Sequence, residues 1–176
     1  YEFGTDFLKI KATNKTTKNL EDSPSWVGIR QCAFEEEISC QVELSKSETV
    51  SKDSTAESGL SLFMDENHHY DIFITKEGND FYANSRICVG QAESVKEKIK
   101  LESNKATFKI LVNAYCYQLF MQTEKDMILL SQAETRYLSS EVAGGFTGVY
   151  LGFYAVDSDS SAVATFTNLS VIHKEK

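Results

Sequence analysis

The stretch Phe34-Glu35-Glu36-Glu37-Ile38-Ser39-Cys40-Gln41-Val42-Glu43-Leu44 decides the fold class, because apolar and polar side chains alternate along most of its length. A period of two is typical of an antiparallel strand that has one face in a core and the other in water. Only Glu36 interrupts the pattern, so we expect a half-buried strand with Phe34 on its core face. The apolar face comprises Phe34, Ile38, Cys40, Val42 and Leu44.

The same alternation recurs along the whole chain. Apolar runs at 60–64 and 70–74 flank a polar connection and predict a hairpin, and Gly78 and Asn79 predict the next turn, because both residues tolerate positive φ. The segment 92–101 fits a helix face or a strand, and we favour a strand because its neighbours are extended. About a dozen strands predict an all-β, two-sheet antiparallel sandwich that forms one domain over 1–176. Further strands are expected near 7–12, 26–31, 81–89, 106–114, 115–121, 146–155 and 162–172.

The composition limits the partners. The 176 residues carry 26 acidic and 18 basic side chains, a net charge of -8, which repels phosphate backbones. No stretch approaches the roughly 18 apolar residues of a membrane span, and residues 1–6 do not resemble a signal peptide. Nucleic acid and membrane are therefore not predicted partners, and the cellular compartment stays open. Four dispersed cysteines are predicted to be buried free thiols: Cys32, Cys40, Cys88 and Cys116.

Three segments in a fixed order carry a family resemblance. The first is Pro24-Ser25-Trp26-Val27-Gly28-Ile29-Arg30-Gln31 followed by Phe34, and the second runs from Ala56-Glu57-Ser58-Gly59-Leu60 to a hairpin ending at Tyr70. The third, Gly144-Gly145-Phe146-Thr147-Gly148 and the strand after it, is the most specific. Together they resemble the β-sandwich that follows the catalytic propeller in many family 43 glycoside hydrolases, the β-xylosidase and α-L-arabinofuranosidase group.

This resemblance implies a concanavalin A-like jelly roll that packs on a five-bladed catalytic propeller. In some family members an aromatic residue from a loop of the sandwich borders the substrate pocket, and Phe146 is the matching residue here. By the same resemblance, Trp26, Arg30 and Gln31 are candidates for the pocket border or the interface. The strand expected before Phe7 is reduced to residues 1–3, which suggests a piece of a larger protein. Thr167 stands where an acidic residue is often found, which argues against a calcium site carried over from related jelly rolls.

No catalytic residue is predicted in this chain. Glycoside hydrolysis needs two carboxyl groups that flank the scissile bond, and the resemblance places both in the propeller. Glu35, Glu37 and Glu43 project from one strand face, but alternate acids are what a solvated sheet face normally shows.

The remaining polar motifs have structural interpretations that we favour. His68 and His69 are adjacent and should point to opposite faces, so we interpret them as turn residues and not metal ligands. Asp157 and Asp159 are weak candidates for calcium, but their segment lacks the glycine and glutamate of a calcium loop and fits a polar connection between strands. We therefore predict no cofactor.

Aromatic residues could stack on sugar rings, since a ring offers an apolar face and a polar rim. Core packing is the favoured interpretation for most of them, and Tyr82, beside the turn at 77–80, is the candidate for stacking on an oligosaccharide. The residues concerned are Trp26, Tyr70, Tyr82, Tyr115 and Tyr117.

Three hypotheses follow. The first is a noncatalytic accessory domain of a family 43 glycoside hydrolase, which should expose an apolar patch that includes Phe146 and neighbours of Trp26. The second is a free-standing carbohydrate-binding module. The third is an independent jelly-roll hydrolase that uses Glu35 or Glu37.

Overall fold

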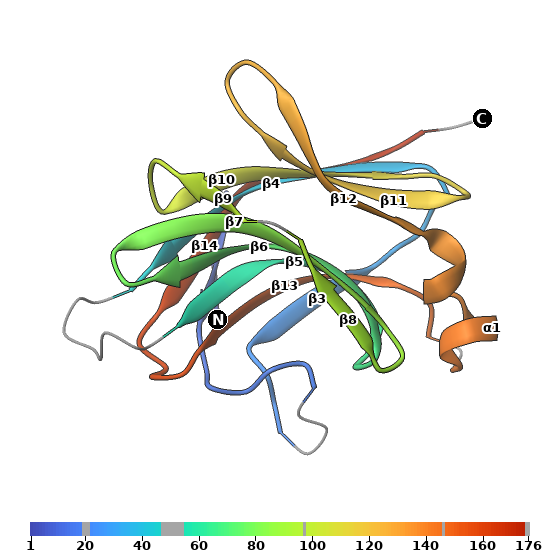
Figure 1. Cartoon of the computed structure of the whole chain (residues 1–176), viewed down its shortest axis with the longest axis horizontal. Helices are drawn as coiled ribbons and strands as arrows, with labels where there is room; N and C mark the ends of the chain where they lie inside the picture. The colour runs from blue at the N-terminus through green and yellow to red at the C-terminus, as the bar shows by residue number, and fades with distance from the viewer. Residues whose placement is uncertain (19–21, 47–54, 97, 146, 175–176) are drawn as a thin grey trace.

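Two antiparallel sheets face one another in the computed structural model, which describes residues 1–18, 22–46, 55–96, 98–145 and 147–174 (Figure 1). The predicted two-sheet antiparallel sandwich is confirmed. The first sheet has the order β1 (Glu2–Phe3), β2 (Phe7–Lys11), β14 (Val163–His173), β4 (Glu36–Ser45), β10 (Lys105–Val112), β11 (Cys116–Gln122) and β12 (Met127–Glu134). The second has β3 (Trp26–Arg30), β13 (Tyr150–Asp157), β5 (Ala56–Asp65), β6 (His68–Glu77) and β7 (Asp80–Val89), followed by β8 (Ala92–Val95) and β9 (Ile99–Leu101), which both pair with β7.

The core lies between the two sheets and is filled by the inward-facing residues of each strand. Aromatic pairs in edge-to-face contact join the layers: Tyr70 of β6 meets Tyr117 of β11 at 5.8 Å between ring centroids, and Phe153 of β13 meets Phe166 of β14 at 5.4 Å. The largest fully buried side chains are Tyr70, Tyr117, Phe73, Phe108, Ile10, Ile38, Leu44, Leu60, Leu62, Ile72, Ile74 and Ile110.

The strand predicted from the opening stretch begins at Glu36, and the prediction for Phe34 is wrong because that side chain is 81% exposed. Glu36 does not interrupt the core face but belongs to it, and is 3% exposed. Its carboxylate accepts hydrogen bonds from the backbone N–H groups of Cys32 and Ala33, at 3.2 and 2.9 Å, and pairs with His173 at 3.0 Å. The acid that breaks the apolar pattern therefore anchors the loop that precedes the strand.

The hairpins were predicted better than the segments between them. The β5–β6 and β6–β7 turns fall where expected, and Gly78 has φ +58°. Within 92–101 the structure has two strands, β8 and β9, in agreement with the favoured prediction. Three elements were not predicted: β12, the 3₁₀ helix η1 (Thr135–Leu138) and the short helix α1 (Ser140–Ala143).

Two predictions about individual residue types are wrong. All four cysteines are free, but Cys32 is exposed and Cys116 only partly buried, whereas Cys40 and Cys88 are buried as expected. His69 is not a turn residue: it lies in β6 and is 1% exposed.

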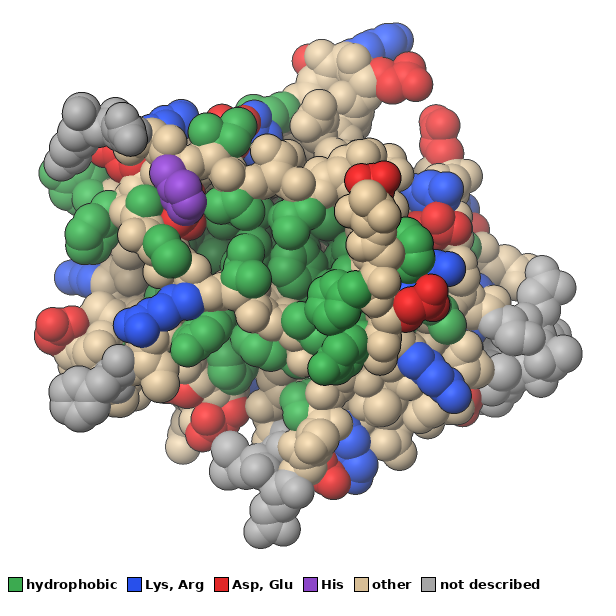
Figure 2. Space-filling view, turned by 180° about the vertical axis from the view of Figure 1, so that it is seen from behind, with side chains coloured by type: hydrophobic (Ala, Val, Ile, Leu, Met, Phe, Trp, Pro, Cys, Tyr) green, Lys and Arg blue, Asp and Glu red, His purple; other side chains and the backbone are tan. Residues whose placement is uncertain are grey.

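The side of the sandwich between the edge strands β1 and β3 is open. A groove of about 600 Å³ runs along it between the two sheets. Figure 2, which shows the far side of the molecule from Figure 1, has a wide field of hydrophobic side chains with a hollow in it. The groove is lined mainly by Phe3, Phe7, Val27, Ile29, Phe166 and Leu169.

Neither described helix has the length or apolar character needed to cross a membrane.

Candidate functional site

One end of the sandwich, here named the loop end, carries the connections 31–35, 113–115 and 135–149. Gln31 joins the two sheets there. Its side-chain oxygen accepts a hydrogen bond from the Tyr117 hydroxyl at 2.9 Å, and its side-chain nitrogen donates to the carbonyl of Ala33 at 2.8 Å. Its backbone N–H donates to the carbonyl of Val149 at 2.9 Å. Gln31 therefore fixes both the loop before β4 and the chain that enters β13.

The glycine-rich segment of the loop end is a turn and not the start of a core strand. Gly144, Gly145 and Gly148 have φ values of +80°, +76° and +73°, a conformation that favours residues without a Cβ. The exposed Arg30 packs beside this turn, because a Cβ on Gly148 would lie 3.2 Å from its guanidinium. Phe146, the residue predicted to border a substrate pocket, lies outside the described residues.

Large apolar side chains are exposed at the loop end. Phe34 is 81%, Tyr115 84% and Val142 46% exposed, and each belongs to a different connection. Figure 1 shows α1 at the same end of the sandwich as the turn between β10 and β11. The carbonyl of Tyr115 accepts a hydrogen bond from Thr135 N–H at 3.0 Å, which ties these two connections together. The prediction that Tyr115 packs in the core is therefore wrong.

The face of the second sheet that points away from the core is here named the outer face. Trp26 lies on it, half-buried against Phe63 and Tyr150 at centroid distances of 5.6 and 6.4 Å. Its indole covers Gly28 and Gly152, where a Cβ would lie 2.1 Å from a ring atom in each case. Gly152 therefore makes room for the Trp26 side chain.

Tyr82 also lies on the outer face, away from Trp26. The Lys98 ammonium is 4.4 Å from its ring centroid, so a cation covers one face of the ring. Tyr70 and Tyr117 are buried core residues, as predicted. The structure thus brings Trp26 and Arg30 to the outer face near the loop end, turns Gln31 inward, and leaves Tyr82 at a distance.

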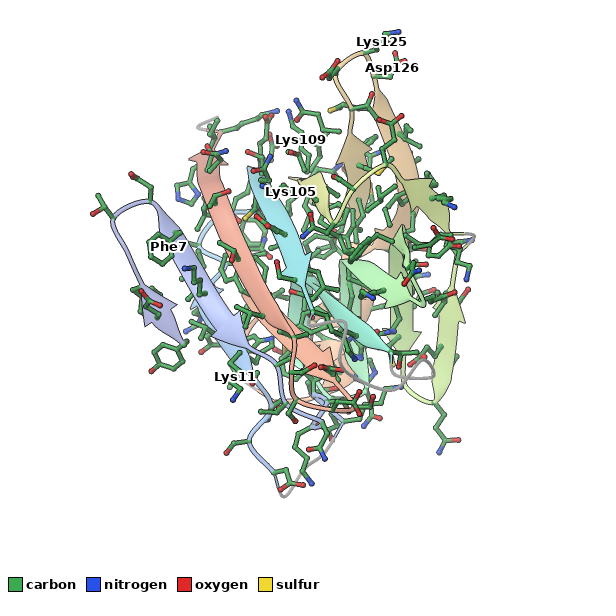
Figure 3. All side chains as sticks on the ribbon, turned by 90° about the vertical axis from the view of Figure 1, so that its left-hand side faces the viewer. Phe7, Lys11, Lys105, Lys109, Lys125 and Asp126 are labelled. Atoms are coloured by element: carbon green, nitrogen blue, oxygen red, sulfur yellow. The ribbon has the colours of Figure 1, made fainter. Side chains whose placement is uncertain are left out.

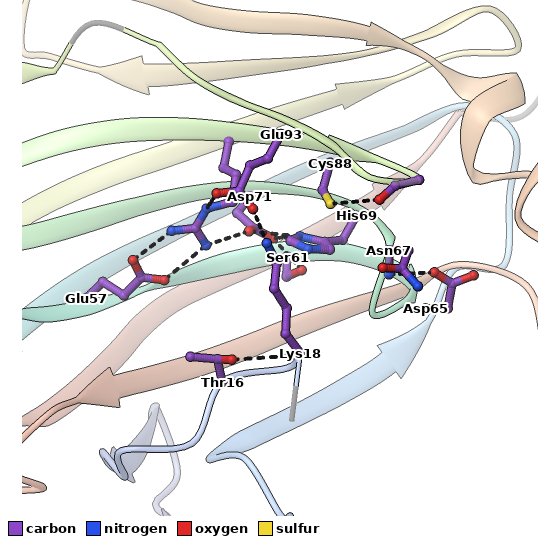
Figure 4. Close-up of polar contacts among 12 residues, drawn as sticks. Thr16, Lys18, Glu57, Ser61, Asp65, Asn67, His69, Asp71, Cys88 and Glu93 are labelled. Atoms are coloured by element: carbon purple, nitrogen blue, oxygen red, sulfur yellow. Dashed lines mark hydrogen bonds and ion pairs between the residues drawn. The ribbon is translucent and has the colours of Figure 1, made fainter. Parts of the chain in front are cut away.

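A cluster of charged residues, here named the charged cluster, occupies the centre of the outer face (Figure 4). Arg86 of β7 donates to both carboxylate oxygens of Glu57, at 3.1 and 2.8 Å, and to Asp71 at 3.0 Å. Asp71 also accepts from the Ser61 hydroxyl at 2.6 Å and lies 2.9 Å from His69 Nδ1. The cluster comprises Glu57, Ser61, His69, Asp71, Arg86 and Glu93. Glu93 pairs with Lys18, which belongs to the segment 14–18.

Burial and charge act in opposite directions within the cluster. Burial alone would raise the pKa of Asp71, but the hydrogen bonds from His69 and Ser61 and the positive charge of Arg86 hold that pKa below its ordinary value. Burial raises the pKa of Tyr154 well above its ordinary value, and the carboxylates of Glu57 and Asp71 raise it further. Asp71 is therefore an anion and Tyr154 a neutral phenol at physiological pH.

A cavity of about 400 Å³ lies over the charged cluster, between it and the segment 14–18. Two of the residues that line it have a buried polar atom without a hydrogen bond within the described residues: Nε2 of His69 and the hydroxyl of Tyr154, whose residues are 1% and 4% exposed. This site was not predicted from the sequence. The available signal was the run of polar side chains on the non-core face of central strands, at 57, 61, 69, 71 and 86.

The calcium candidates have protein partners. The Asp157 carboxylate accepts backbone N–H groups of Ser161 and Ala162, at 2.8 and 2.9 Å, and pairs with Lys46 at 2.5 Å. Burial would raise the pKa of Asp157, but Lys46 and these amides hold it well below its ordinary value. Asp159 lies 3.5 Å from the same lysine. Asp157 therefore holds the β13–β14 connection in place.

The acids on the outer side of β4 are matched by lysines of the neighbouring strand. Lys109 pairs with Glu37 at 2.5 Å and Lys105 with Glu43 at 3.0 Å. Figure 3 shows Lys105 and Lys109 along this sheet. These two cross-strand ion pairs agree with the interpretation of the acids as part of a solvated sheet face.

The chain belongs to the family of β-xylosidase C-terminal concanavalin A-like domains, because the model of that family matches residues 3–171. The predicted resemblance to family 43 glycoside hydrolases and the predicted jelly roll are confirmed. Among curated proteins, the chain is similar to the non-reducing end α-L-arabinofuranosidase BoGH43B of Bacteroides ovatus. The two are 33% identical over 155 residues, which make up 84% of this chain and 27% of that protein.

Solved structures share the fold of this chain. Bacteroides ovatus Xyloglucan PUL GH43B superposes with a TM-score of 0.77, at 25% identity, over 97% of this chain and 38% of that one. Xylan β-1,4-xylosidase from Bacillus halodurans gives a TM-score of 0.74 at 18% identity, over 92% of this chain and 32% of that one, which shows a shared fold. The chain thus spans roughly a third of the length of these relatives.

Proposed function

We propose that this chain is the noncatalytic accessory domain of a family 43 glycoside hydrolase that acts on pentose-containing fragments of plant polysaccharides. The family match and the names of the relatives, an arabinofuranosidase and a xylosidase, support the class of enzyme. In this proposal the catalytic carboxylates belong to a five-bladed propeller elsewhere in the parent protein. The sandwich supports that propeller and closes one side of its substrate pocket.

The observation that carries the docking surface is the exposure of Phe34, Tyr115 and Val142 at the loop end. Exposing three large apolar side chains from adjoining connections to water is unfavourable, and contact with a second domain would bury them. The apolar surface continues into the open groove, since Ile29 precedes Arg30 and is 44% exposed. Phe146 lies in the same connection as Val142, so its role at the pocket border belongs to this proposal.

A rival apolar surface exists on the edge strand β12, where Met127, Ile128 and Leu129 are 45%, 36% and 48% exposed. Their strand pairs only with β11 among the described residues, so this edge could also receive another domain. The loop end is preferred because it carries the glycine-rich segment that resembles the family motif. β12 therefore serves as the internal control.

The test compares amide hydrogen exchange in the isolated 176-residue chain and in the parent enzyme. Docking at the loop end predicts slower exchange in the parent at 31–35, 113–116 and 140–143, with unchanged exchange at 127–129. Slower exchange confined to β12, or equal exchange everywhere, contradicts the proposed docking surface.

A variant pair sharpens the test. Phe34→Ser in the parent enzyme should lower its melting temperature and raise KM, because the substrate pocket loses its support, whereas the isolated chain should be unaffected. Leu129→Ser removes an apolar side chain from β12 that is 48% exposed, against 81% for Phe34, and should do neither. Equal effects of the two substitutions on the parent would remove the reason to prefer the loop end.

A further inference from the structure

The cavity over the charged cluster has the properties of a binding site that the docking proposal does not use. It lies on the outer face, and the residues that line it include His69 and Tyr154, whose Nε2 and hydroxyl are buried. Buried polar groups in proteins are almost always hydrogen-bonded, so two unpaired groups that line one cavity point to a ligand that pairs with them. The volume of about 400 Å³ lies within the range of small-molecule sites.

The charges around the cavity exclude most classes of ligand. Both cations already bind carboxylates: Arg86 binds Glu57 and Asp71, and Lys18 binds Glu93. An anionic ligand would meet three carboxylates, and a cationic one would have to break these pairs. A neutral polar ligand leaves the network intact.

Hydroxyl groups of a ligand are suited to pair with the two unpaired groups. His69 Nδ1 lies 2.9 to 3.0 Å from the Asp71 carboxylate and carries a proton toward it, so in the neutral ring Nε2 is an acceptor. The Tyr154 hydroxyl both donates and accepts. Carboxylate oxygens of Glu57 and Glu93 add further acceptor sites on the cavity wall. A ligand with several hydroxyl groups, each both donor and acceptor, satisfies this set.

An aromatic hollow adjoins the polar cavity. Thr17 lines both spaces, and the second space is also lined by Trp26 and Phe63, whose rings are 5.6 Å apart. A sugar combines hydroxyl edges with apolar C–H faces, and an aromatic surface beside hydrogen-bonding groups suits both. We propose that the cavity over the charged cluster binds one neutral sugar unit through His69 and Tyr154, beside the ring of Trp26.

The choice of pentoses as probes rests on the proposed function, whereas the class of ligand rests on the cavity. The experiment titrates the 176-residue chain with D-xylose, L-arabinose and xylobiose, followed by calorimetry and by the fluorescence of Trp26, which is the sole tryptophan of the sequence. D-glucuronate is titrated in parallel as an anionic sugar. We expect saturable binding of at least one of the three neutral sugars, a change in Trp26 emission, and weaker binding of glucuronate.

Tyr154→Phe is the decisive variant because it removes only the unpaired hydroxyl. Loss of one hydrogen bond to the ligand should weaken sugar binding about three- to tenfold. The stability of the free chain should change little, since the Tyr154 hydroxyl makes no hydrogen bond of normal geometry within the described residues. Tyr82→Phe makes the same change on the same sheet face outside the cavity and should leave binding unchanged.

Three outcomes would overturn the inference: no saturable binding of any neutral sugar, tighter binding of glucuronate than of xylose, or equal affinities in wild type and Tyr154→Phe. An equal loss in Tyr82→Phe would do so as well. These measurements test the outer face and not the docking surface at the loop end. A negative result here would therefore not decide the outcome of the docking experiment.

Discussion

The hydroxyl of the buried Tyr117, near the start of β11, donates a hydrogen bond to the side-chain oxygen of Gln31 at 2.9 Å and thereby joins the first sheet to the chain that leaves β3 of the second. Gln31 then donates to the carbonyl of Ala33, one residue before the exposed Phe34. A buried residue of the first sheet therefore helps to position the loop between β3 and β4, which carries the exposed Phe34.

Tyr117→Phe should lower the free energy of unfolding by about 1 kcal/mol, because the Gln31 oxygen loses its donor. Urea denaturation measures this loss, and amide exchange at Ala33 and Phe34 should become faster. Tyr70→Phe is the matched control: its hydroxyl donates to the carbonyl of Glu134 at 2.8 Å, so stability should fall similarly without an effect at 33–34. If the two variants change exchange at 33–34 equally, Gln31 does not hold this loop.

Gly152→Ala should lower the free energy of unfolding by about 1–3 kcal/mol, because the added methyl group would meet the Trp26 indole 2.1 Å away. The emission of the single tryptophan should shift to the red as the ring is displaced toward water. In a Trp26→Ala background the same glycine substitution should cost much less, and a double-mutant cycle measures the difference. An additive cycle would show that Gly152 is needed for some other reason.

Asp157→Asn should destabilise the chain by about 3 kcal/mol at pH 7, because the buried Lys46 loses the nearer of the two carboxylates, those of Asp157 and Asp159, with which it pairs. The pKa of Asp157 is lowered by folding, so its stabilising effect is present above the unfolded value of about 3.9 and disappears as the pH falls through the folded value. The difference in the free energy of unfolding between wild type and variant should therefore become smaller below about pH 4, as measured by denaturation. Asp159→Asn, at a more exposed partner of the same lysine, should cost less than about 1 kcal/mol. A gap that stayed constant down to pH 2 would contradict the role given to Asp157.

Thiol labelling of the native chain should distinguish the cysteines by burial. Burial raises the pKa of Cys40 to about 12, despite a hydrogen bond with the Thr167 backbone, so its reactive thiolate is scarce at neutral pH. Cys32 is exposed and should react first with an aromatic disulfide reagent. Cys32→Ser should abolish the fastest phase, whereas Cys40→Ser should leave it unchanged. A fast phase that survives Cys32→Ser would show that another thiol is accessible.

The sequence alone determined the sandwich and most of its hairpins, because an alternation of period two needs no knowledge of distant residues. It also carried the family resemblance, which resides in short local motifs around Arg30, Gln31 and Phe146. It failed for Phe34 and Tyr115, since both lie within two residues of a strand end. There, local pattern cannot say whether a side chain turns into the core or out of it.

Only the tertiary structure decided the candidate binding site. His69, Asp71, Arg86 and Tyr154 come from three strands, and their relation depends on strand register, which sets which side chains share a row of the sheet. The histidine pair that suggested a turn became a buried partner of Asp71 for the same reason. Periodicity shows that a residue faces away from the core, but whether that face is solvent, a cavity or an ion pair is fixed by segments that cross it from elsewhere in the chain.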